Sequence, residues 1–232
     1  CEMNQNKLLC SSSKVNCPVV RLPECRDANY DSTPCPLLTC NLYCKYGFIQ
    51  DKNGCNICQC DNTPPIYNHQ EIVEKPPCSS KDACPIITEY ALGGIHGYTT
   101  YRISLDINPS YENMYALFGA KGLDLILPPA WHSNSPYGTN VGGLSSTMIA
   151  INRETMYDSW MTIGISDGDP LKQLATVGIN FDLWKDESQF IIHDGAVFSI
   201  NPNNLLSTTN RYLIAQLTVR NNQDHSIQFN VQ

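Results

Sequence analysis

The sequence predicts a mainly β protein in which a disulfide-rich N-terminal part precedes an antiparallel β-sandwich. Two observations support this fold class. All 12 cysteines of the 232-residue chain lie between Cys1 and Cys84, a density typical of a disulfide scaffold. From residue 85 onward, short runs of alternating apolar and polar residues are separated by Gly, Asn and Pro turns, which is typical of antiparallel strands. The N-terminal part is therefore expected to be held by crosslinks and the C-terminal part by a core.

The composition along the chain divides it into three expected regions. Residues 1–60 form a disulfide-rich region, 61–84 a proline-rich spacer that ends in a small disulfide loop, and 85–232 the β-sandwich. The spacer brackets a short apolar segment with two Pro-Pro pairs, which favour extended backbone over helix. Cys78 and Cys84 close the small loop most simply with their own disulfide.

The third region contains nine or ten short strand candidates. Their ranges are 101–107, 113–118, 123–127, 147–151, 160–165, 175–181, 190–192, 196–200, 212–219 and 227–231. Turn clusters such as Asp167-Gly168-Asp169-Pro170 separate them. No amphipathic helix is expected. Strands of this length and spacing indicate an all-β sandwich of jelly-roll or immunoglobulin-like type.

Within the N-terminal part, residues 35–60 carry six cysteines at short, regular spacing. They are Cys35, Cys40, Cys44, Cys55, Cys58 and Cys60. Between the third and fourth cysteines, Asn53-Gly54 supplies the backbone that a tight hairpin turn requires. A segment this short cannot bury enough apolar surface to fold alone, so we expect three disulfides in place of a core. The sequence leaves the pairing of the remaining N-terminal cysteines, Cys1, Cys10, Cys17 and Cys25, open.

The stretch from Cys35 to Cys60 resembles the antistasin-like module of invertebrate serine-protease inhibitors. The resemblance lies in the cysteine spacing, in Tyr46-Gly47-Phe48 and in Asp51-x-Asn53-Gly54-Cys55. It implies the pairings Cys35–Cys55, Cys40–Cys58 and Cys44–Cys60. It also implies a reactive bond after the second cysteine, at Asn41 followed by Leu42. The family places a basic residue there, and asparagine offers no charge to the carboxylate of a trypsin-like pocket.

The cysteine content indicates the compartment of the protein, and its charge excludes some kinds of partner. An even number of cysteines at this density indicates an oxidising compartment, so we expect a secreted or cell-surface protein. The net charge is −7 with no basic block, which argues against a nucleic acid or an anionic membrane surface as partner. No apolar run is long enough to span a membrane.

The sequence carries no recognisable enzyme or metal motif. The five histidines stand singly, and neither a nucleophile elbow nor a phosphate-binding glycine loop occurs. We therefore expect no enzyme, no cofactor and no metal. Asp167 and Asp169 are interpreted as turn residues rather than calcium ligands. Trp131 and Tyr137, together with Tyr157 and Trp160, are a candidate glycan platform because sugar faces pack on aromatic rings. We favour the alternative that these large aromatics fill the end of the sandwich core.

Three functions remain open at this point. The first is a non-enzymatic extracellular structural protein, a subunit of a surface filament or matrix that assembles by strand or linker docking between copies. The extended spacer and a final strand ending at residue 231 motivate it, because an uncovered sheet edge accepts a strand from another chain. The second is a serine-protease inhibitor of antistasin type. The third is a carbohydrate-binding surface protein.

Overall fold

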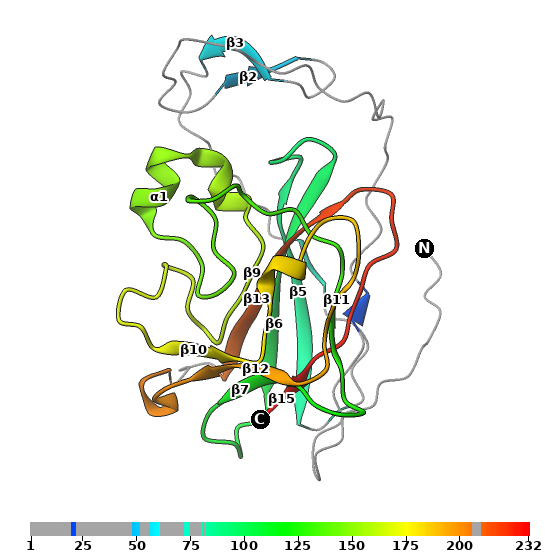
Figure 1. The fold of residues 1–232 in the computed structure, drawn as a ribbon, viewed down its shortest axis with the longest axis vertical. Helices are drawn as coiled ribbons and strands as arrows, with labels where there is room; N and C mark the ends of the chain where they lie inside the picture. The colour runs from blue at the N-terminus through cyan, green and yellow to red at the C-terminus, as the bar shows by residue number, and fades with distance from the viewer. Residues whose placement is uncertain are drawn as a thin grey trace.

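The computed structural model describes residues 80, 82–205 and 210–232, together with short segments at 20–21, 48–51, 56–60 and 72–74. This part of the chain is mainly β, as predicted, and every pairing between its named strands is antiparallel. Figure 1 shows the long strands of the C-terminal region at the centre of the view, with loops and one short helix around them. The type of sandwich and the domain boundaries stay predictions.

The largest sheet has five strands in the order β4-β5-β6-β13-β9. Their bounds are β4 (Ile72–Glu74), β5 (Ala83–Leu92), β6 (Tyr98–Ile107), β9 (Trp160–Met161) and β13 (Arg211–Arg220). β5 and β6 form a hairpin whose connection contains Gly93 and Gly97 at φ of 70° and 79°, a backbone region that glycine enters without steric cost. The alternation that predicted a strand over 101–107 is correct, and that strand begins at Tyr98.

A second sheet has four strands in the order β10-β12-β7-β15, and three strand pairs stand apart from both sheets. The four strands are β7 (Ala116–Gly119), β10 (Leu174–Val177), β12 (Gly195–Ser199) and β15 (Asn230–Val231). The pairs are β8 (Leu125–Leu127) with β11 (Phe190–Ile192), β1 (Val20–Arg21) with β14 (Ser226–Ile227), and β2 (Phe48–Gln50) with β3 (Asn56–Cys60).

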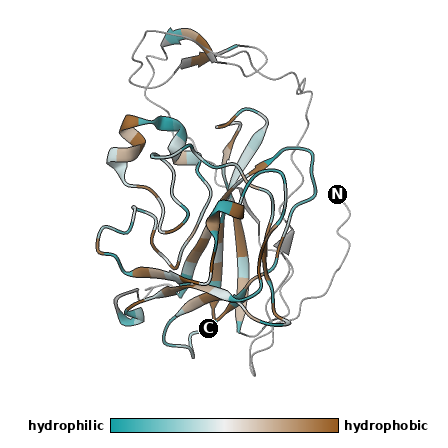
Figure 2. Cartoon of the chain, viewed as in Figure 1, coloured by the Kyte–Doolittle hydropathy of each residue, from teal (hydrophilic) through white to brown (hydrophobic). Residues whose placement is uncertain are grey.

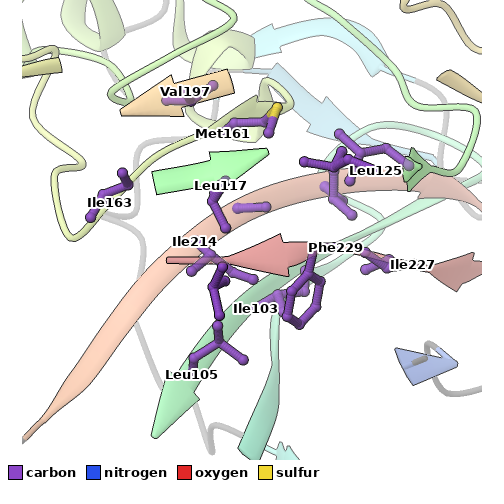
Figure 3. Close-up of a cluster of buried hydrophobic side chains, with 14 of the residues drawn as sticks. Ile103, Leu105, Leu117, Leu125, Met161, Ile163, Val197, Ile214, Ile227 and Phe229 are labelled. Carbon is purple, nitrogen blue, oxygen red and sulfur yellow. The ribbon is translucent and has the colours of Figure 1, made fainter. Parts of the chain in front are cut away.

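Side chains from both large sheets meet in one core. β6 shows why: Tyr101, Ile103 and Leu105 are at most 1% exposed, while the residues between them point to the other face. Figure 3 shows Ile103 and Leu105 of this sheet near Leu117, Phe229 and Ile214. Figure 2 shows the apolar colouring gathered on the strands and the polar colouring on the connecting loops. Burial of this apolar surface is the main force holding the C-terminal region together.

The expectation of no helix is wrong. Residues Ser146–Ile151 form α1, and the 3₁₀ helices η1 (Arg153–Tyr157), η2 (Phe181–Leu183) and η3 (Pro202–Leu205) follow. The strand predicted over 147–151 is therefore a helix. The Ser145 hydroxyl accepts a hydrogen bond from Met148 N at 3.3 Å, and this N-cap satisfies a backbone donor that a new helix leaves free.

The spacer contributes a strand to the C-terminal region of its own chain. Ile72, Val73 and Glu74 pair with Glu89, Thr88 and Ile87 of β5, which agrees with the predicted extended backbone. β1 pairs with β14 in the same way. Among the described residues, no helix is long and apolar enough to cross a membrane.

Candidate functional site

The hairpin β2–β3 is the described part of the cysteine-rich stretch 35–60. Phe48 pairs with Cys60 and Gln50 with Asn56, with an irregularity in register between the two pairs. The two strands flank residues 52–55, where the Asn53-Gly54 signal predicts a tight turn. Figure 1 shows this hairpin at the top of the view. The sequence thus predicted a hairpin at the correct place in the chain.

Neither face of β3 is covered along its centre. Ile57, Cys58 and Gln59 are three consecutive exposed residues, with Ile57 at 36%. Because successive strand residues point to opposite faces, exposure of all three means that solvent reaches both sides. An isolated two-stranded hairpin is marginally stable in water. The Cys58 sulfur is in a disulfide, and a covalent bond of this kind constrains the chain where a core does not.

Most of the predicted site lies outside the described residues. This holds for the proposed reactive residues Asn41 and Leu42, and for the cysteines Cys35, Cys40, Cys44, Cys55 and Cys78. Cys60 ends β3, and the Cys84 sulfur, in β5, is in a disulfide. The three pairings implied by the family resemblance, and the bond between Cys78 and Cys84, stay predictions.

The loop with the candidate glycan residues is firmly attached to the C-terminal region. Trp131 N donates to Thr218 O at 2.8 Å, and Trp131 O accepts from the Ser159 hydroxyl at 2.7 Å. Trp131 and Tyr137 are both half-buried. Trp160 is only 2% exposed, so this aromatic fills the core, as the favoured alternative predicts. Glycan binding at Trp131 and Tyr137 stays a prediction.

A buried carboxylate, which the sequence analysis missed, braces this loop. Asp158 is 0% exposed and accepts hydrogen bonds from Ser133 N at 2.8 Å and Thr139 N at 2.6 Å. His132 Nδ1 lies 3.6 Å from Asp158 Oδ1. A Cβ on Gly138 would lie 2.5 Å from Ser133 O, so only glycine allows this close approach. Asp158 follows a short 3₁₀ helix and belongs to no motif, so no sequence signal could have identified it.

A charged cluster where β6 begins and β13 ends is the second group that sequence reasoning missed. The Tyr98 hydroxyl donates to Asp186 Oδ2 at 2.6 Å, and Arg220 Nη2 donates to the same oxygen at 2.6 Å. Burial, together with this hydrogen bond, raises the pKa of Tyr98 well above its usual value. Burial works to raise the pKa of Asp186, but the hydrogen bonds from Tyr98 and Arg220 outweigh it and lower that pKa. Tyr98 and Arg220 are thus both paired with Asp186, and because the ion pair is partly exposed it contributes little to stability.

The acidic turn at residues 167–169 is attached to the segment of Gly142 and Gly143, since Gly168 N donates to Gly142 O at 3.0 Å and Asp167 forms a β-bridge with Gly143. Both oxygens of the Asp169 carboxylate accept backbone hydrogen bonds, from Gln173 N at 2.8 Å and Leu174 N at 2.9 Å. The carboxylate therefore stabilises its own loop, as Asp does in turns. Within the described part of the chain, no three His, Cys, Asp or Glu side chains are grouped so that they could hold a metal ion.

Comparison with known proteins identifies the cysteine-rich stretch. The model of the Antistasin family matches residues 35–60. The protein named "Antistasin" from Hydra vulgaris is 43% identical over 35 residues, which are 15% of this chain and 16% of the Hydra protein. This chain therefore matches only a small part of that relative's length. No solved structure gives a significant match.

These comparisons overturn the first functional prediction. A subunit of a surface filament or matrix is wrong, because the similarity to antistasin points to a serine-protease inhibitor. Nothing in the comparisons supports self-association. In the structure, the strand of the spacer pairs with β5 of its own chain. The similarity is confined to one segment, and that segment, residues 35–60, is an antistasin-like module.

Proposed function

We propose that the protein is a secreted serine-protease inhibitor that acts through its antistasin-like module. The observation that carries this proposal is the match of residues 35–60 to the Antistasin family. The hairpin β2–β3 supports it, since a solvent-exposed, crosslinked scaffold suits the presentation of a rigid loop to an enzyme. Rigid presentation raises affinity because less conformational entropy is lost on binding. An inhibitor of this kind performs no chemistry of its own, consistent with a protein that is not an enzyme.

The proposed reactive residues determine the class of protease. Asn41 and Leu42 are uncharged and Tyr43 is aromatic, so none of the three forms a salt bridge in a trypsin-like pocket. Chymotrypsin-like enzymes have an apolar pocket instead, and an uncharged or apolar side chain fits it. We therefore expect the target to be a serine protease that cleaves after uncharged residues.

The test is inhibition of trypsin, chymotrypsin and elastase by the full chain. We expect inhibition of chymotrypsin or elastase at concentrations roughly tenfold or more below those needed for trypsin. In the variant Asn41→Arg, trypsin inhibition should rise by about tenfold or more, because a guanidinium pairs with the pocket carboxylate.

The matched control is Asn62→Arg, which makes the same change of charge two residues beyond the module. It should leave inhibition of each enzyme unchanged. If neither the natural chain nor Asn41→Arg inhibits a serine protease, the proposed function is wrong. If both arginine variants raise trypsin inhibition equally, the effect is general electrostatic attraction and Asn41 is not the reactive residue.

A further inference from the structure

The strand β10 lies at one edge of the four-stranded sheet, where it pairs with β12 (Figure 1). Its sequence, Leu-Ala-Thr-Val, contains no charged residue and no proline, and its pairing with β12 has no bulge. Edge strands usually carry such features, because they prevent another chain from pairing with the strand. The edge strand β4 of the larger sheet ends in Glu74, and Lys75-Pro76-Pro77 follow it in the sequence. β10 is therefore the less protected of these two edges.

The backbone of Thr176, within β10, faces the open side of this edge. In an antiparallel ladder, residues whose N–H and C=O groups bond to the neighbouring strand alternate with residues whose groups point away from it. Ile200 N donates to Gln173 O at 2.8 Å, so Gln173 faces β12. By this alternation Ala175 and Val177 also face β12, and Thr176 between them directs both groups outward. Thr176 is exposed, and within the described part of the chain neither of its backbone groups has a hydrogen-bond partner.

A hydrogen bond to the preceding loop agrees with this alternation. Leu174 lies two residues before Thr176, so its N–H should also point away from β12. This N–H donates to Asp169 Oδ2 at 2.9 Å. The Asp169 carboxylate thus closes one end of the edge and leaves the part around Thr176 open.

The sheet face beside this open edge is apolar. Opposed residues of paired strands point to the same face, so the register of β10 and β12 places several apolar side chains together. They are Ala175, Val177, Ala196, Phe198 and Ile200. Val177 is 60% exposed and Ile200 is 62% exposed, and the other three are half-buried. Exposed apolar surface that adjoins an unpaired strand edge indicates an interaction site.

Two exposed charged residues lie at the two ends of this edge. Lys172 stands two positions before β10, at its N-terminal end. Asp194 lies at the C-terminal end, because a Cβ on Gly178, the residue after β10, would lie 2.4 Å from Asp194 O. Neither Lys172 nor Asp194 forms an ion pair with a described residue. An antiparallel strand with a basic residue at its N-terminal end and an acidic residue at its C-terminal end complements both charges.

We propose that β10 is a docking edge for an extended segment of another protein, which adds to the four-stranded sheet as an antiparallel strand. Such a segment matches both features, because its backbone exchanges two hydrogen bonds with Thr176 and its side chains extend the apolar face. From its N-terminus it carries a basic residue, an apolar residue opposite Val177, a polar residue opposite Thr176, an apolar residue opposite Ala175, then a polar and an acidic residue. The proposal goes beyond protease inhibition and does not depend on it.

The test is an NMR titration of the full chain with the synthetic peptide acetyl-Lys-Val-Thr-Val-Thr-Glu-amide. We expect the amide resonances of residues 174–177 to shift and to saturate with a dissociation constant of about 1 mM. The same peptide methylated on the backbone nitrogen of its first threonine cannot donate to Thr176 O, so it should bind about fivefold more weakly. The charge-reversed peptide acetyl-Glu-Val-Thr-Val-Thr-Lys-amide should bind about threefold more weakly at low ionic strength.

Two variants of the chain test the edge and the apolar face separately. Thr176→Pro removes the outward N–H and leaves the ladder to β12 in place, because proline is tolerated on an edge strand where its nitrogen faces solvent. Val177→Lys puts a charge on the apolar face. Each should weaken binding of the first peptide by about fivefold. The matched control is Leu92→Lys, the same kind of change at a side chain that is 61% exposed at the end of β5, and it should leave binding unchanged.

The methylated peptide tests the hydrogen bond to Thr176 in the natural chain, so the result stands even if Thr176→Pro does not fold. Three results would each overturn the proposal. One is the absence of shifts in β10 at about 5 mM peptide. Another is equal binding of the methylated peptide, which would mean apolar adsorption without strand pairing. The third is a shift of the same amides with protein concentration alone and no further change with peptide, which would mean that the edge pairs with a second copy of this chain.

Discussion

The hairpin β2–β3 and the strand β6 are both antiparallel elements, but they are held by opposite means. In β3, three consecutive residues are exposed, and one of them is a cysteine in a disulfide. In β6, Ile103 and Leu105 are 0% exposed and pack into a core shared by two sheets. The strand conformation is the same in both, so the conformation itself does not determine what stabilises a strand. A disulfide at Cys58 constrains the first, and burial of apolar surface holds the second.

This difference determines where each of the two regions tolerates amino-acid substitutions. In the hairpin, the side chains of Ile57 and Gln59 are exposed, so we expect substitutions at these two positions to cost little packing energy. The core of the C-terminal region has no such freedom, because proteins pack their interiors about as densely as organic crystals. We therefore expect damage to one region to leave the other intact.

The largest effect is expected from removing a crosslink of the module. The family resemblance implies that Cys40 is bonded to Cys58. In Cys40→Ser/Cys58→Ser, we expect the loss of this disulfide to lower the unfolding free energy of the module by about 2–5 kcal/mol, a loss that abolishes folding of small domains. Inhibition of the target protease should fall below detection, while the unfolding free energy of the C-terminal region should change by less than about 0.5 kcal/mol. Both quantities are measured on the same preparation. Retained inhibition would show that the module does not depend on this pair.

The reverse experiment is a cavity in the core. Leu105→Ala, at a site with 0% exposure, should lower the unfolding free energy of the C-terminal region by about 2–5 kcal/mol. Inhibition by the folded fraction should not change, because Leu105 packs in the C-terminal core and not in the hairpin. Leu171→Ala is the control, since the side chain of Leu171 is 77% exposed. This substitution should lower the unfolding free energy by less than about 0.5 kcal/mol. Equal effects of the two variants in denaturant titrations would contradict the assigned core.

The same difference explains how much the sequence could predict. The module was identified from its sequence because cysteine spacing is a covalent constraint that one segment carries by itself. Strand β6, with its clear alternation, and strand β13, with its long apolar run, were also predicted. The sequence predicts a strand where α1 forms, because the five apolar-rich residues from Thr147 to Ile151 are too few to distinguish the helical period of about 3.6 residues from the strand period of about 2. Only the capping serine at position 145 signalled a helix.

The long strand β5 was missed for a different reason. Pro85 near its start and the polar pair Thr88 and Glu89 interrupt the alternation, and proline in a run weakens a strand prediction. The strand forms because its neighbours pair with it, β6 on one side and β4 on the other. Asp158 and the cluster around Asp186 were missed for a related reason, since their partners lie far away in the sequence. Such tertiary pairings leave no local pattern.

A smaller effect is expected at the buried carboxylate that braces the loop of Trp131. In Asp158→Asn, one oxygen is replaced by an NH₂ group that cannot accept from Ser133 N or Thr139 N. Hydrogen bonds to a charged acceptor contribute about 1.5–3 kcal/mol each. We therefore expect the unfolding free energy, measured by denaturant titration, to fall by about 2 kcal/mol. The exposed carboxylate of Asp182 provides the control, and Asp182→Asn should have little effect. A loss below about 0.5 kcal/mol for Asp158→Asn would mean that the loop is held by its other contacts.

The smallest effect, and one confined to the core-held region, concerns pH. The hydrogen bonds from Tyr98 and Arg220 lower the pKa of Asp186 below its value in the unfolded chain. A lowered folded-state pKa gives stability that is fully present above the unfolded pKa, near 4, and is lost as pH falls through the folded value. Because the cluster is partly exposed and screened by solvent, we expect it to contribute at most about 1 kcal/mol to the unfolding free energy.

Asp186→Asn should therefore remove part of the acid-induced loss of stability below about pH 4, measured by denaturant titrations across pH. An unchanged slope would show that Asp186 is not the titrating group. The hairpin β2–β3 contains none of the three residues of this cluster, so inhibition by the module should not follow the same pH dependence.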